Sequence, residues 1–129
     1  MKCVNPVMLF DKPGYPLGLR VACGKCLACR IAKRREWAAR MIHELSCHDD
    51  AVFITLTYND EYNDGSVHLR DFQLFLKRLR KSLGERKIRY FACGEYGELS
   101  QRPHYHAILF GLSLRDSDKK LIMDAWRIS

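Results

Sequence analysis

The chain has 129 residues, which is enough for one compact domain with a modest core and too few for two independent domains. Hydrophobic residues make up 47% and charged residues 29%, a balance that fits an enzyme and a binding module equally. The 22 Lys and Arg against 15 Asp and Glu leave a net charge of +7, which favours a polyanionic partner such as nucleic acid. No apolar run is long enough to span a bilayer and Met1–Phe10 lacks a secretory pattern, so we expect a cytoplasmic protein with no membrane partner.

The first half of the chain predicts an arm, a helix and a strand. Prolines and glycines are frequent in Met1–Ala22 and predict an irregular arm. Apolar residues recur at helical spacing over Cys26–Cys47, and basic residues crowd the rest of that predicted helix. Val52–Tyr58 is rich in β-branched and aromatic residues and is bounded by turn-forming residues, which predicts a strand.

The second half predicts two helices and a hairpin. An apolar stripe predicts a helix over Leu69–Leu83, and another predicts a final helix over Asp116–Trp126. Ile88–Cys93 and His104–Phe110 are expected strands, joined by a turn-rich connection over Gly94–Pro103. This order predicts an α+β fold in which helices flank an antiparallel sheet, with an N-terminal Cys-rich arm and helix added to it.

A candidate metal site lies on the predicted hairpin. His104 and His106 are two residues apart in a strand, so both imidazoles leave the same face and can converge on one ion. Glu95 lies across the hairpin and would complete a set of two histidines and a carboxylate, which suits Mg²⁺ or Mn²⁺ acting on a phosphodiester. Glu98 is the alternative carboxylate, and Glu95 is preferred because a strand end holds a ligand more firmly than a loop tip.

Four cysteines form a second candidate metal site. Three of them follow a C-x-x-C-x-x-C pattern, and a structural Zn²⁺ is a possible occupant of the set Cys3, Cys23, Cys26 and Cys29. Such a site would restrain the arm, because it would join Cys3 to the start of the first predicted helix. The alternative is that these thiols stay free, and His43 or Cys47 can also be recruited as a ligand.

The basic excess and the polar face of the first strand suggest a surface for single-stranded DNA. Basic runs are more often only solvated helix faces, but threonines beside a metal site can donate hydrogen bonds to phosphates. We expect DNA to be held mainly by its backbone, and the candidate contacts are Thr55, Thr57, Arg34, Arg35, Lys77, Arg78 and Arg102.

Several motifs resemble those of HUH rolling-circle replication initiators, and among them the initiators of gokushovirus-like Microviridae, which are small phages with single-stranded DNA. The motifs are FITLTY at Phe53–Tyr58, CGEYG at Cys93–Gly97 and RPHYHAILFG at Arg102–Gly111. The Cys-x-Asn-Pro start at Cys3, the CGKCLACR segment and the DFQLFLKRLRK helix at Asp71–Lys81 extend the resemblance over nearly the whole chain.

The resemblance implies a ferredoxin-like HUH core that nicks and rejoins single-stranded DNA at a replication origin. It implies that a tyrosine attacks a DNA phosphate while an ion held by His104, His106 and Glu95 stabilises charge on the phosphoryl oxygens. It also implies the cytoplasm of a phage-infected or lysogenic bacterial host as the location, and host replication proteins as further partners.

The chain departs from the family pattern at the nucleophile. The family's tyrosine lies on a helix well after the HUH strand, whereas no tyrosine follows Tyr105 here. We therefore interpret residues 1–129 as a single initiator domain that is truncated at its C-terminus, with a Cys-rich arm and basic helix in 1–50 and a metal-binding sheet core in 51–129. Such a chain would bind the ion and DNA but cleave weakly or not at all.

Two other interpretations remain open on sequence grounds. One is a non-catalytic, zinc-stabilised module that binds single-stranded DNA, such as a phage remnant. The other is a transcription regulator that reads duplex DNA with a basic helix, which would need base-reading side chains on a recognition helix and not a His-x-His strand.

Overall fold

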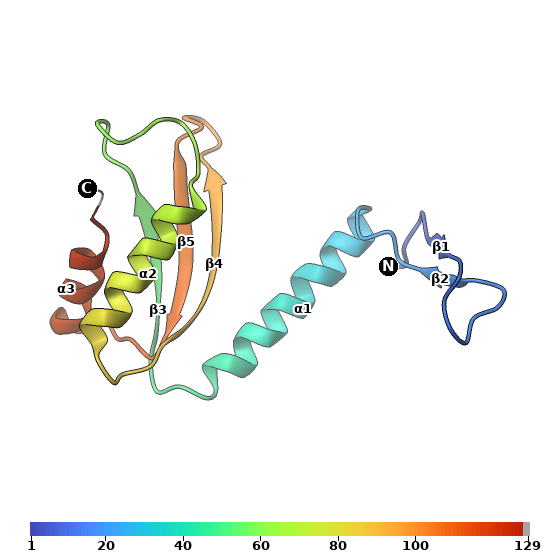
Figure 1. The fold of residues 1–129 in the computed structure, drawn as a ribbon, viewed down its shortest axis with the longest axis horizontal. Helices are drawn as coiled ribbons and strands as arrows, with labels where there is room; N and C mark the ends of the chain where they lie inside the picture. Colours follow the sequence, from blue (N-terminus) through green and yellow to red (C-terminus); the bar gives the residue numbers. More distant parts are fainter. Residues whose placement is uncertain (128–129) are drawn as a thin grey trace. The chain divides into compact units, whose positions relative to one another are not determined.

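The structure is a computed structural model, and it describes residues 1–127. It divides into two compact units, residues 1–43 and the residues from Glu44 onward. The N-terminal unit contains two short antiparallel strands, β1 (Val7–Leu9) and β2 (Leu19–Val21), and most of helix α1 (Leu27–Leu45) (Figure 1). The predicted helix over Cys26–Cys47 is confirmed within two residues at each end.

The prediction of an irregular arm is wrong where β1 pairs with β2. Val7 pairs with Val21 and Leu9 pairs with Leu19, so the arm forms a small hairpin. The prolines and glycines that argued against a helix lie outside these strands, most of them in the connection between them. Gly14 and Gly18 have φ angles of 85° and 88° there, which glycine adopts without steric cost.

The second unit is built on a three-stranded antiparallel sheet with the order β3-β5-β4. Its strands are β3 (Ala51–Thr57), β4 (Arg89–Tyr96) and β5 (Pro103–Phe110). The predicted hairpin is confirmed, but β4 runs three residues beyond its predicted end at Cys93. The turn-forming residues from Gly94 suggested a loop, whereas the ladder continues until Tyr96 pairs with Pro103.

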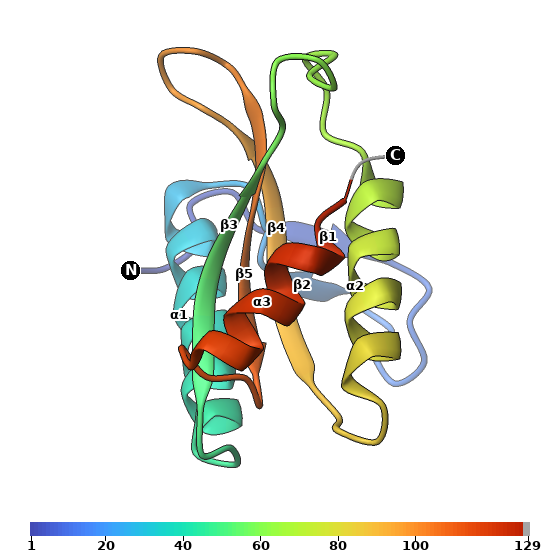
Figure 2. The same ribbon diagram turned by 90° about the vertical axis from the view of Figure 1, so that its left-hand side faces the viewer.

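Helices α2 (Leu69–Leu83) and α3 (Asp116–Ala125) contact each other and lie on the same side of this sheet (Figure 2). α2 has the predicted bounds, and α3 ends one residue before the predicted end. The core between helices and sheet contains Phe75, Leu79, Leu109 and Leu112, which are almost completely buried. The predicted α+β fold, in which helices flank an antiparallel sheet, is therefore confirmed.

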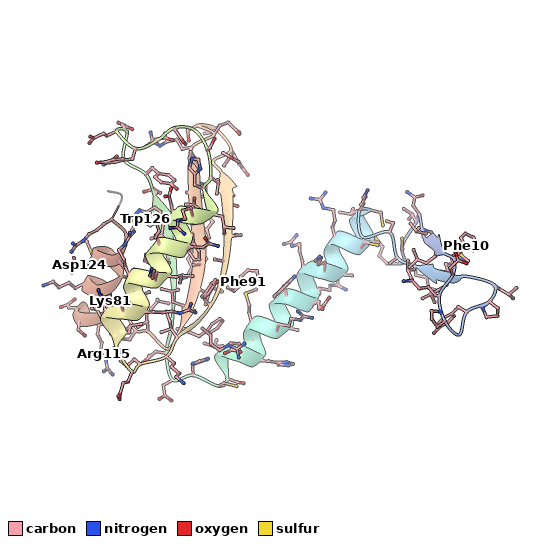
Figure 3. All side chains as sticks on the ribbon, viewed as in Figure 1. Phe10, Lys81, Phe91, Arg115, Asp124 and Trp126 are labelled. Atoms are coloured by element: carbon pink, nitrogen blue, oxygen red, sulfur yellow. The ribbon has the colours of Figure 1, made fainter. Side chains whose placement is uncertain are left out.

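Trp126, which is labelled in Figure 3, joins the C-terminal end of the described chain to this core. Trp126 follows α3, packs against Tyr58, Phe75 and Tyr105, and donates a hydrogen bond from Nε1 to the carbonyl oxygen of Thr57 at 2.8 Å. The end of β3 is thus fixed from the helix side.

The two faces of the sheet differ in burial. Along β5, Tyr105, Ala107 and Leu109 are buried beneath the helices, while the residues between them are partly exposed. On β3, Phe53, Thr55 and Thr57 are exposed while Val52 and Leu56 are buried. Because side chains alternate along a strand, the polar residues of β3 share one open face with the even-numbered residues of β5.

One buried carboxylate connects α3 to the rest of the second unit. Asp118 is 4% exposed and accepts hydrogen bonds from Arg86 at 2.9 Å and from the backbone N–H of Ser113 at 2.9 Å. The Arg86 guanidinium, together with the Ser113 N–H, holds the pKa of Asp118 far below its usual range.

Within residues 1–127, no helix has the length and apolar character required to cross a membrane.

Candidate metal centre and nucleic-acid interface

The register between β4 and β5 brings three metal-ligand side chains together on the open face. Glu95 pairs with His104, and His106 follows two residues later on the same face of β5. One carboxylate oxygen, Oε1 of Glu95, lies 2.9 Å from Nε2 of His104 and 2.7 Å from Nε2 of His106. The structure therefore brings together the three residues that the sequence selected.

The arrangement suits a divalent cation. The three ligand atoms lie within 4.8 Å of one another, so one ion can be reached by all of them. The side chains of His104 and His106 are 17% and 27% exposed, and that of Glu95 is 51% exposed. The three ligand atoms are therefore open to solvent on one side.

The other nitrogen of each imidazole is also engaged. Nδ1–H of His104 donates to the carbonyl oxygen of Arg102 at 3.1 Å, because a carbonyl can only accept. Nδ1 of His106 lies 3.0 Å from the hydroxyl oxygen of Thr55, which can accept the same kind of bond. The contact with the Arg102 carbonyl favours the tautomer that leaves Nε2 of His104 free to bind a metal, and the contact with Thr55 orients the ring of His106.

Without a bound ion, the cluster of Glu95, His104 and His106 is held together by hydrogen bonds between its carboxylate and its imidazoles. Hydrogen bonds from His104 and then His106 lower the pKa of the Glu95 carboxyl. The hydrogen bond to the Arg102 carbonyl, followed by the bond to Glu95, raises the pKa of His104 above its ordinary value of 6.5. The cluster therefore holds an ionised carboxylate next to an imidazole that readily takes up a proton.

The alternative carboxylate lies elsewhere. Glu98 belongs to the connection between β4 and β5, where its backbone oxygen accepts a hydrogen bond from the Gln101 side chain at 3.3 Å. Among the described residues it is not part of the group of ligand atoms that contains Glu95.

The predicted DNA contacts lie in different parts of the chain. Thr55 and Thr57 pair with His106 and His104 and are exposed beside the metal site. Lys77 and Arg78 belong to α2, on the other side of the sheet, and Arg78 donates to the carbonyl oxygen of Ala125 at 2.8 Å. Arg34 and Arg35 belong to the part of α1 that lies in the N-terminal unit.

Arg102 is engaged in a structural contact next to the site. Its guanidinium donates to a carboxylate oxygen of Asp60 at 2.7 Å and to the carbonyl oxygen of Tyr58 at 2.9 Å. It thus joins the start of β5 to the loop after β3. Because its own carbonyl accepts from His104, Arg102 also orients that imidazole.

Two direct contacts of His106 were not predicted from the sequence. Thr55 is a predicted phosphate contact, yet its hydroxyl lies against the imidazole. Phe53 is 64% exposed and stacks on His106 with ring centroids 5.4 Å apart. The signal for both is the alternation of β3, which puts Phe53 and Thr55 on the same face.

The tyrosines on and beside the sheet belong to the opposite face. Tyr58 donates to Asp71 at 2.6 Å, and burial with this bond raises its pKa far above the usual range. Tyr105 is buried and donates to the carbonyl oxygen of His68. Tyr90 packs against Phe72, so each of these three side chains is engaged on the helix side of the sheet.

The four selected cysteines also form a group. The Sγ atoms of Cys3, Cys23, Cys26 and Cys29 lie within 4.8 Å of one another, so the group can hold a metal ion. Backbone hydrogen bonds from Cys29 and then Val4 lower the pKa of Cys26 to about 6. Neither His43 nor Cys47 belongs to this group.

A family model for replication-associated proteins of the ORF2 type matches residues 51–129, which is more than half of the chain. The chain belongs to this family. The matched residues include β3, α2 and the β4–β5 hairpin, so the metal-ligand residues lie inside the part that defines membership.

Three replication-associated proteins of phages and viruses show how far the likeness extends. Replication-associated protein VP4 of Bdellovibrio phage phiMH2K is 37% identical over 110 residues, covering 79% of this chain and 35% of VP4. Replication-associated protein ORF2 of Spiroplasma virus 4 is 34% identical, covering 83% of this chain and 37% of ORF2. Replication-associated protein ORF4 of Chlamydia phage 1 is 30% identical, covering 86% of this chain and 30% of ORF4. The chain thus spans about a third of each of these relatives, and no solved structure matches it.

Replacing Thr55 by Val should weaken metal binding by the group of Glu95, His104 and His106. Valine keeps the shape of threonine but cannot form the hydrogen bond with Nδ1 of His106, so the imidazole is held less firmly. We expect Mn²⁺ affinity, measured by isothermal titration calorimetry, to fall about tenfold. The matched control is Thr57→Val, and equal effects of the two substitutions would contradict an orienting role for Thr55.

The metal-free cluster should make stability depend on pH. The raised pKa of His104 gives a contribution that is present below pH 6.5 and is lost as pH rises through its folded pKa. The lowered pKa of Glu95 gives a second contribution to folding stability, which is present above pH 4.5 and is lost as pH falls through the pKa of Glu95 in the folded protein. Glu95→Gln should therefore destabilise the metal-free protein more at about pH 5.5 than at about pH 8.5.

Urea unfolding with chelator present measures this difference, and Glu98→Gln is the control. The same loss of stability at both pH values, or an equal loss in the control, would show that the cluster is not an ion pair.

Proposed function

We propose that this chain binds single-stranded DNA at a metal ion held by Glu95, His104 and His106, as part of the nicking and joining that initiates rolling-circle replication. The observation that supports it is the convergence of two imidazole nitrogens on one carboxylate oxygen, on an open sheet face. Membership of the replication-associated family agrees with this role. The cytoplasm of a phage-infected or lysogenic bacterial host is the proposed location, with host replication proteins as further partners.

When bound, Mg²⁺ or Mn²⁺ would act as a Lewis acid on a phosphoryl oxygen of the DNA. The residues of the chain position the reacting phosphate. His104 and His106 are fixed through Arg102 and Thr55, and Glu95 supplies a negative charge that favours cation binding. The shallow, solvent-facing position of the site suits an extended single strand, which can approach along the sheet.

Single-stranded DNA would follow the open face of β3 and β5. Thr57 is exposed beside His104 and can donate a hydrogen bond to a phosphate. Phe53 offers an exposed ring on the same face as Thr55, and aromatic rings on a sheet face stack with bases of any sequence. Arg102 remains a proposed phosphate contact beside this face. Lys77 and Arg78, on the helix side of the sheet, and Arg34 and Arg35, in the N-terminal unit, would contact other parts of the DNA and add the salt-dependent part of the affinity.

Cleavage also needs a nucleophile, and we propose that this chain alone supplies a poor one. Tyr58 and Tyr105 are buried on the helix side of the sheet, where their hydroxyls hold other groups. Tyr96 belongs to the same face of β4 as Tyr90, and its hydroxyl accepts from the backbone N–H of Val67. This favours a second interpretation, in which the chain itself is a metal-dependent DNA-binding module.

The ion should strengthen binding of single-stranded DNA. We expect Mn²⁺ to raise the affinity for a labelled oligonucleotide, measured by fluorescence anisotropy, by about tenfold, because it adds one charge-assisted phosphate contact. The double substitution His104→Ala and His106→Ala should abolish this increase while leaving the metal-independent, salt-sensitive binding in place.

The matched control is His68→Ala, since His68 lies at the start of α2 and pairs with Asp64. An Mn²⁺ effect that survives the double substitution, or tighter binding of duplex than of single-stranded DNA, would contradict the proposal.

The chain should form little or no covalent adduct with DNA. Labelled single-stranded oligonucleotides incubated with Mn²⁺ and separated on a denaturing gel would reveal a phosphotyrosine link as a shifted band. Robust adduct formation by the unmodified chain would contradict the proposal that this chain alone supplies a poor nucleophile. Loss of that adduct in Tyr62→Phe would then identify Tyr62, an exposed loop residue, as the nucleophile.

A further inference from the structure

The N-terminal unit contains four thiols within reach of a single ion. Sγ of Cys23 lies 3.9 Å from Sγ of Cys29, and Sγ of Cys3 lies 3.9 Å from Sγ of Cys26. A tetrahedral zinc ion with Zn–S bonds of about 2.3 Å holds its sulfur ligands about 3.8 Å apart. We propose that these four cysteines bind one structural Zn²⁺ as thiolates and release their protons to solvent.

The backbone around the thiols is already arranged to hold negative sulfur. The N–H groups of Lys25 and Cys26 point at Sγ of Cys23, at 3.4 and 3.3 Å, and the N–H of Cys23 points at Sγ of Cys3 at 3.3 Å. Hydrogen bonds from backbone amides stabilise a thiolate in the same way as a neighbouring positive charge. Together with the backbone hydrogen bonds to Cys26 described above, at least three of the four sulfurs therefore have donors in place.

The start of α1 adds to this preference for an anion. Cys26 directly precedes the helix and Cys29 lies in its first turn, where free N–H groups carry partial positive charge. The first turn of α1 has no acidic residue, so no carboxylate fills that role. A zinc ion with four thiolates carries a net charge of about −2 and would offset the partial positive charge at the start of this helix.

The unit also lacks the apolar core that would otherwise fold it. All of residues 1–43 are described, and Ala28 is the one buried residue among them. Val7 and Phe10 in the hairpin are 46% and 67% exposed. A unit of this size without a core depends on a cross-link or a metal, and the site joins Cys3, before β1, to Cys23, after β2. Zinc would therefore fold the hairpin and fix it to α1.

The experiment is a metal analysis of the full chain purified under reducing conditions, by mass spectrometry of bound metals. We expect one Zn²⁺ per chain, and the same content in the double substitution His104→Ala and His106→Ala. Substitution of Co²⁺ for Zn²⁺ should give the intense visible absorption of a tetrahedral thiolate site. This inference therefore stands or falls separately from the proposed function.

Three variants test the ligand set. Cys3→Ser should lower zinc affinity at least tenfold, measured against a competing chelator. Cys26→His should keep the ion, because three thiolates and one imidazole also form a stable zinc site. Cys47→Ser is the matched control, since Cys47 is an exposed cysteine outside the group, and it should bind zinc like the unmodified chain.

Removal of the ion should unfold the hairpin and leave the sheet of the second unit folded. In amide NMR spectra, addition of a strong chelator should collapse the dispersed signals of residues 1–26 and leave those of β3, β4 and β5 in place. Full zinc content in Cys3→Ser, loss of the ion in the histidine double variant, or a hairpin that survives chelation would each overturn the proposal.

Discussion

The pairing of Glu95 with His104 across β4 and β5 is the constraint on which the candidate site depends. It puts a carboxylate beside one imidazole, and the two-residue period of β5 adds the second. A shift of one residue in this register would turn Glu95 away from the histidines and toward the helices. The register is held because Tyr105 and Ala107, which alternate with the histidines, are buried on the other face.

The packing of the buried face therefore determines which side chains lie on the open face of the sheet. The Tyr58 and Tyr105 hydroxyls lie 2.8 Å apart and connect β3 and β5 to α2 through Asp71 and His68. With these residues committed to packing, the open face is left to two imidazoles, a carboxylate, threonines and the exposed ring of Phe53. The soft thiolates of the N-terminal unit and this harder group of oxygen and nitrogen atoms suit different ions, so the two proposed sites would take different metals.

Most of the fold could be predicted from the sequence because its local signals agree with the tertiary structure. The apolar stripe of Leu69–Leu83 gave the bounds of α2, and the His-x-His spacing on a strand selected the ligand pair. What failed depended on pairing between distant residues: β1 and β2 are too short to stand out locally, and β4 extends through Gly94 because β5 continues beside it. The orienting contacts from Arg102 and Thr55 also depend on this geometry and not on residue type.

The most direct test of the metal centre is the binding of Mn²⁺ to the unmodified chain and to Glu95→Ala, followed by electron paramagnetic resonance. Free aqueous Mn²⁺ gives a strong signal that is broadened on binding, so the titration counts the bound ions. We predict one site of this kind per chain, lost in Glu95→Ala and retained in Glu98→Ala, which removes a carboxylate from the neighbouring loop. Unchanged binding in Glu95→Ala, or a loss confined to Glu98→Ala, would contradict this assignment.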